Sequence, residues 1–154
     1  MSRNAPHADD PQKAGFVFAL LCEFLGDYGE EKSNFSDDEL VAVQRIAACC
    51  RAATGTGSLG DTPEQLAAFL AWRQGPDANA AVGVASLVTA LETLRKSWRA
   101  DPAQQHEFAV AMLALWRGDD RMTKAERAMA PLVFGMLGIP PDVVAAAKMP
   151  AGRP

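Results

Sequence analysis

Apolar residues recur at helical spacing along most of the chain. Residues 16–25 and 108–116 are apolar on nearly all sides, apart from Glu23, which is typical of helices at the centre of a fold. Over residues 84–98 the apolar positions are three or four apart, as on one buried helix face: Val84, Leu87, Val88, Leu91, Leu94 and Trp98. No segment has the alternating pattern of a strand. The pattern predicts seven helices and an all-α fold.

The predicted helices begin at recognisable start signals. Two of these are capping boxes, in which a Ser or Thr at the N-cap is followed three residues later by Glu: Ser36–Glu39 and Thr123–Glu126. The others combine a capping residue with a nearby Pro, and they are Asp10-Pro11, Thr62-Pro63, Asp101-Pro102 and Pro140-Pro141-Asp142. The short connections between these helices favour antiparallel packing of neighbours.

The length of 154 residues fits a single domain. A chain of this size buries roughly 70% of its unfolded surface, enough to form a core without a disulfide or a structural metal. We expect one helical domain over residues 11–148, a disordered tail over 1–10 and a frayed end over 149–154. The odd number of cysteines, Cys22, Cys49 and Cys50, indicates reduced thiols and a cytoplasmic location.

Charge and hydropathy exclude several classes of function. The net charge is −4 and no basic stripe is present, so nucleic acid is not an expected partner. No apolar run approaches the ~20 residues that span a bilayer, so we expect no transmembrane helix. An acidic surface attracts cations.

Two segments of the chain resemble each other. Residues 16–27 read FVFALLCEFLGD and residues 108–119 read FAVAMLALWRGD, which align without a gap. Each segment ends in Gly-Asp, and each is followed by a loop and one of the two capping boxes, although the first loop is longer. The repeat predicts two helix–loop–helix units with a pseudo-symmetric arrangement.

Carboxylates gather in both loops. In the second unit, Asp119 and Asp120 follow one helix and Glu126 lies in the first turn of the next. The first unit offers Asp27 and Glu39 at the corresponding places. Clustered carboxylates suit a hard cation such as Ca²⁺ or Mg²⁺, although neither loop has the EF-hand pattern. The capping boxes alone also account for the two glutamates, so these residues are either cation ligands or ordinary loop and cap residues.

Residues 119–126 (DDRMTKAE) and 137–141 (LGIPP) resemble the TerB-like family of tellurite-resistance proteins, which includes domains like the DjlA N-terminus. Asp119, Thr123 and Glu126 match the family motif, whereas Asp120 replaces its usual Gly and Met122 its usual aliphatic residue. Asp27, Ser36 and Glu39 match only if the first loop is allowed to be longer. The resemblance implies a seven-helix, internally pseudo-symmetric domain that binds divalent cations through these acidic residues. It further implies a non-catalytic role in the stress response, with protein partners at the inner membrane surface.

Two other functions compete with this one. The first is a protein-interaction domain that binds no metal, in which the acidic loops serve capping and solubility. The second is a metal-dependent or thiol enzyme, for which the adjacent Cys49 and Cys50 are the candidate thiols. Buried cysteines usually act as small apolar residues, and Cys50 falls on a predicted buried stripe. The direction of Glu23, the lone charge in its helix, stays open between solvent, the acidic loop and a basic partner.

Overall fold

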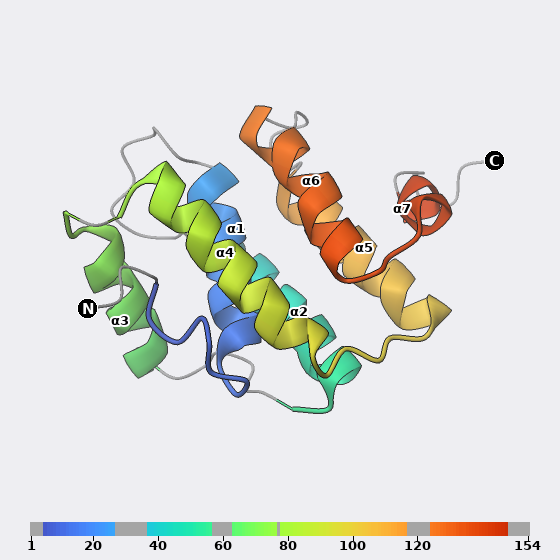
Figure 1. Ribbon diagram of the computed structural model, residues 1–154, viewed down its shortest axis with the longest axis horizontal. Coiled ribbons are helices and arrows are strands. Elements are labelled where there is room, and N and C mark those ends of the chain that lie inside the picture. Colours follow the sequence, from blue (N-terminus) through green and yellow to red (C-terminus); the bar gives the residue numbers. More distant parts are fainter. Residues whose placement is uncertain (1–4, 27–36, 57–62, 77, 117–123, 148–154) are drawn as a thin grey trace.

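The computed structural model describes residues 5–26, 37–56, 63–76, 78–116 and 124–147. Within these residues all the regular structure is helical, which confirms the all-α prediction (Figure 1). The seven helices described are α1 (Ala14–Gly26), α2 (Asp37–Thr54), α3 (Pro63–Arg73), α4 (Ala80–Arg95), α5 (Pro102–Trp116), α6 (Lys124–Met136) and α7 (Pro141–Ala147).

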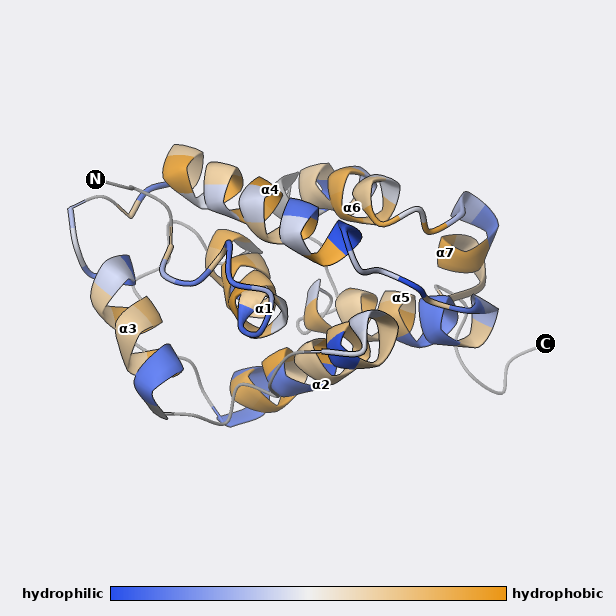
Figure 2. Ribbon diagram, turned by 60° about the horizontal axis from the view of Figure 1, so that its bottom comes forward, coloured by the Kyte–Doolittle hydropathy of each residue, from blue (hydrophilic) through white to orange (hydrophobic). Residues whose placement is uncertain are grey.

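Helix α1 is the centre of the fold. The other helices surround it in Figure 2, with α4 on one side and α2 on the other. Its side chains from Phe16 to Leu25 are all buried, including those on opposite sides of the helix. This burial explains why the segment is apolar nearly all round, because a helix enclosed by protein has no face that needs polar residues.

The outer helices extend this arrangement from α1. Helix α2 packs on α5, α5 packs on α7, and α6 lies against both α1 and α4. Phe134 of α6 meets α5 through edge-to-face contacts with Phe108 and Trp116, at ring-centroid distances of 6.3 and 6.0 Å. Helix α3 lies at the edge of the molecule (Figure 1). The result is one apolar core shared by all the longer helices.

The N-terminal segment differs from the expected tail. Ala5 and Ala8 are buried, and the backbone N–H of Ala5 donates a 2.8 Å hydrogen bond to the hydroxyl of Ser86, which is itself buried in α4. Small side chains let this segment lie close to the helices, and the hydroxyl satisfies a buried backbone donor. The segment expected to be a tail therefore packs against the helices at Ala5 and Ala8, and residues 1–4 and 148–154 lie outside the described part.

The observed helix N-termini agree with the start signals predicted from the sequence to different degrees. Asp101 and Gln104 form a reciprocal capping box at α5, in which each backbone N–H donates to the other's side chain at 2.8–2.9 Å. At Asp10 the side chain accepts from the N–H of Gln12, but the regular helix begins only at Ala14. Helix α4 is capped by Asn79, which accepts from the N–H of Val82 at 3.0 Å and which the sequence reading missed.

Candidate functional site

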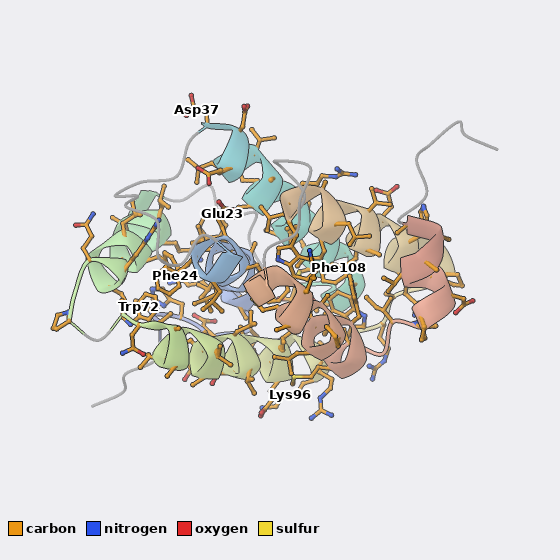
Figure 3. The ribbon with its side chains drawn as sticks, turned by 90° about the horizontal axis from the view of Figure 1, so that it is seen from above. Glu23, Phe24, Asp37, Trp72, Lys96 and Phe108 are labelled. Carbon is orange, nitrogen blue, oxygen red and sulfur yellow. The ribbon has the colours of Figure 1, made fainter. Side chains whose placement is uncertain are left out.

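The predicted cation ligands fall mainly in parts of the chain that the structure does not describe. Asp27, Asp119 and Asp120 lie outside the described residues. Glu126 lies in the first turn of α6, where only the backbone is described. Glu39 lies in the first turn of α2 and is partly exposed, next to the exposed Asp37 and Asp38. Asp37 stands at the outer end of α2 in Figure 3.

The described helix ends frame both acidic loops. Helix α1 ends at Gly26 and α2 begins at Asp37, while α5 ends at Trp116 and α6 begins at Lys124. The end of α1 and the beginning of α6 lie at the same end of the molecule (Figures 1 and 3), and the two helices pack against each other. The core therefore holds the helix ends on either side of the two loop sequences in place.

The last turn of α1 carries a buried carboxylate. Glu23 is only 7% exposed, so it does not face open solvent. Figure 3 places it on the side of α1 that faces α2. A carboxylate in this position carries a desolvation cost unless polar or charged groups compensate it. This burial excludes a solvent-facing Glu23, one of the three orientations that the sequence left open.

An aromatic cluster lies on the other side of this last turn. The ring of Phe24 makes edge-to-face contacts with Phe69 and Trp72 of α3, with centroids 6.5 and 5.5 Å away. The guanidinium carbon of Arg73 lies 5.7 Å from the centroid of the same ring, a cation–π distance. The convergence of Phe69 and Trp72 on Phe24 depends on where α3 docks, which the helical pattern does not specify.

Helix α4 closes the same cluster from its other side. A Cβ on Gly83 would stand 2.8 Å from Cδ2 of Leu25 and 3.1 Å from Cε2 of Phe24. Both distances are shorter than ordinary carbon contacts, so any side chain at position 83 would displace these two residues. The glycine therefore allows α4 to lie directly on the last turn of α1.

The cysteines occupy core positions rather than a reactive site. Cys22 and Cys50 are buried, and Cys49 is partly exposed. Burial raises the pKa of all three thiols, and neighbouring Cys50 and Glu23 add to this for Cys22. Beside Cys49, Arg45 lowers the pKa and Glu107 raises it, but burial is the largest effect. Raised pKa values favour the neutral thiol, which is a poor nucleophile and a poor metal ligand.

The described residues contain no group of three or more His, Cys, Asp or Glu side chains placed to hold a metal ion. None of the helices in the described part has the length and hydropathy of a membrane span.

No family model, curated protein or solved structure matches this chain.

Proposed function

We propose that the protein is a non-catalytic helical module of the TerB-like type that binds a divalent cation, Ca²⁺ or Mg²⁺, between α5 and α6. Asp119, Asp120 and Glu126 are the proposed ligands. A second site between α1 and α2 uses Asp27 and Glu39. The resemblance to tellurite-resistance proteins supports a stress-response role in the cytoplasm, exerted through protein partners.

The observation that carries this proposal is the repeated unit formed by an apolar helix, Gly-Asp, a loop and a capping box. Most equivalent positions of the two apolar helices are buried in both, although Cys22 and Glu23 are buried where Ala114 is exposed and Leu115 is partly exposed. The buried pairs are Phe16 with Phe108, Ala19 with Ala111, Leu21 with Leu113 and Phe24 with Trp116. Matching burial supports the interpretation that the two units are copies of one design. The same sequence pattern then brings carboxylates to corresponding loops.

The chemistry of the loops supports a hard cation over a soft one. Carboxylate oxygens and backbone carbonyls are the ligands that Ca²⁺ and Mg²⁺ prefer. A bound cation would neutralise repulsion between neighbouring carboxylates, which otherwise opposes their convergence. It would also fix the loop between two helices of one unit. The expected consequence is a change in the helix face that a partner protein meets.

Metal titration with thermal melting tests the proposal. Ca²⁺, Mg²⁺, Mn²⁺ and Zn²⁺ are added in turn to the metal-free protein. A ligand that binds only the folded state stabilises it by about 2.7 kcal/mol at one hundred times its dissociation constant, so Ca²⁺ or Mg²⁺ should raise the melting temperature. The double variant Asp119→Ala/Glu126→Ala should lose most of the increase. The variant Asp27→Ala/Glu39→Ala tests the second loop in the same way.

A matched control removes the same amount of negative charge elsewhere. Glu92 and Asp142 are exposed on α4 and α7, so Glu92→Ala/Asp142→Ala should keep the full response to the metal. Trp116, the last residue of α5, gives a second readout. With Trp72→Phe and Trp98→Phe, the remaining tryptophan fluorescence should change on cation binding. An unchanged melting temperature with every ion, or a full response in the Asp119→Ala/Glu126→Ala variant, would reject the site and favour the metal-independent interaction domain.

A further inference from the structure

Helix α3 is attached to the rest of the molecule in a different way from the other helices. Its contact with α1 is made by large side chains, with Phe69 fully buried and Trp72 beside it, both against Phe24. The two side chains also contact each other, at a centroid distance of 5.4 Å. Within the described residues, the helix pairs with extensive backbone approach are formed by α1, α2, α4, α5, α6 and α7, and α3 takes part in none of these pairs. Figure 2 shows it at the edge of the helices that enclose α1.

This attachment determines what is lost when α3 leaves. Releasing it breaks the contacts of Phe69, Trp72 and Arg73 with α1, and it also uncovers the buried Gln65 and the core-packed Leu66 and Leu70. It requires no other closely packed helix pair to separate. The packing of α1 on α4 and α2, and of α2 on α5, does not pass through α3. Elements with low local contact density open at lower free energy than the core does. With eleven residues, α3 is also too short to be a stable helix by itself in water.

The last turn of α1, which α3 covers at Phe24, packs against α4 on its other side. Phe24 and Leu25 are 6% and 4% exposed and are pressed by α4 at Gly83, whose virtual Cβ lies 2.8 Å from Leu25. Removing α3 would therefore leave the Phe24 ring in place, because α4 and the α1 backbone still position it. The uncovered surface would be a preformed apolar seat on the last turn of α1. We define the α1 seat as Phe24 and Leu25.

We propose that α3 is a cover that opens as a unit from an otherwise intact bundle and exposes the α1 seat, of which α3 is the resident occupant. Opening of α3 requires no bound cation and is independent of the function proposed above. The Arg73 guanidinium over the Phe24 ring adds a polar contact at the outer end of this cover. The position of the cover is significant because the last turn of α1 leads directly into the first acidic loop.

Hydrogen exchange under native conditions tests the proposal on the unmodified protein. Amides of α3 should exchange about tenfold or more faster than those of α1 and α5, because they need only local opening. Their exchange should also depend weakly on low concentrations of guanidinium, because local opening exposes little surface. If α3 and α5 exchange at the same rate and with the same dependence on guanidinium, α3 belongs to the cooperative core and the proposal is wrong.

Proteolysis separates opening of the whole helix from fraying at its ends. Phe69 and Phe108 are both 0% exposed and both lie within helices, so they form a matched pair of chymotrypsin sites. Opening of α3 predicts cleavage after Phe69 well before cleavage after Phe108 in the native protein. Equal resistance at the two sites, even with fast exchange at the ends of α3, would show fraying only and would overturn the proposal.

A glycine pair tests whether the α1 seat holds the cover. Gly83→Ala should displace Leu25 and Phe24 and so accelerate exchange in α3 more than in α5. Gly135→Ala is the matched control, because a Cβ there meets nothing within 4 Å, and it should leave α3 exchange unaccelerated. Equal acceleration of α3 and α5 by Gly83→Ala would mean that α3 unfolds only with the core, against the proposal.

Discussion

Gly15 of α1 lies directly against Cys50 of α2. A Cβ added at position 15 would stand 2.9 Å from the Cβ of Cys50 and 3.7 Å from its sulfur. The first of these atoms is fixed to the α2 backbone, so it cannot move away by a change of rotamer. This glycine therefore sets how closely the two helices approach, at the end of the molecule opposite to the Gly83 contact.

Replacing this glycine should separate α1 from α2. Gly15→Ala gains helix propensity, but it forces the backbones apart, and overpacking of this kind costs about 1–3 kcal/mol. Urea unfolding measures the change in the free energy of unfolding. Gly135→Ala on α6 is the control, because it has open space and should be neutral or stabilising by up to about 1 kcal/mol. A Gly15→Ala protein as stable as the parent would show that the contact is easily relieved.

The buried thiols should make the fold sensitive to alkaline pH. Burial raises the pKa of Cys22 and Cys50 in the folded protein above the ordinary thiol value of about 8.5. As the pH rises past that value, the unfolded chain loses thiol protons that the folded chain keeps. Unfolding is then favoured, and each buried thiol lowers the free energy of unfolding by up to about 1.4 kcal/mol per pH unit.

The thiol contribution is measured by comparing slopes rather than stabilities. Urea unfolding from pH 8 to 10.5 gives the pH dependence for the parent protein and for Cys22→Ala/Cys50→Ala. The variant has a lower stability throughout because of its cavities, but its decline above pH 9 should be shallower. Identical slopes for the two proteins would assign the alkaline decline to other groups.

The capping box of α5 should contribute measurably to stability. Asp101→Ala removes the acceptor for the N–H of Gln104, and loss of an N-cap side chain costs about 0.5–2 kcal/mol. Asp101→Asn keeps an acceptor oxygen and should recover most of the loss. Thermal unfolding of the three proteins at equal pH makes the comparison. If the Asp101→Asn protein is no more stable than the Asp101→Ala protein, Asp101 stabilises the helix through its charge rather than through the hydrogen bond.

The N-terminal segment should stabilise the domain through α4. Ser86→Ala leaves the buried N–H of Ala5 without its acceptor, which costs about 1–3 kcal/mol if the segment stays in place. Deleting residues 1–8 removes Ala5 and Ala8 together and uncovers the surface beneath them. Added to this shortened chain, Ser86→Ala should have a much smaller effect than in the full chain. Additive effects of the two changes would show that the bond does not hold the segment.

Patterns of local sequence predicted the helices well because each helix is determined by nearby residues. The apolar periodicity of residues 84–98 and the Asp101-Pro102 start depend only on neighbours a few positions away. Tertiary contacts are different. The buried N–H of Ala5 bonds to Ser86 of α4, and the cluster around Phe24 forms only where α3 docks on the last turn of α1. Neither relationship leaves a periodic signal in the sequence.

The same difference between local and tertiary features applies to the candidate site. Sequence spacing could identify the acidic loops and their capping boxes, and the described helices begin at Asp37 and Lys124, next to the predicted caps. Spacing cannot show whether Asp119 and Glu126 converge, because that depends on the path of the loop between them. Glu23 illustrates the limit, since a lone charge in an apolar helix most often faces water and here does not.

The central position of α1 also has a consequence for biosynthesis. This helix leaves the ribosome before α4 and α6, which cover it in the folded protein. Until then an almost entirely apolar segment has only α2 and α3 to shield it, and exposed apolar surface on a nascent chain promotes aggregation. Production of the protein should therefore depend on chaperones that hold the first helix, and truncations that stop before α4 should be insoluble even when all of α1 and α2 is present.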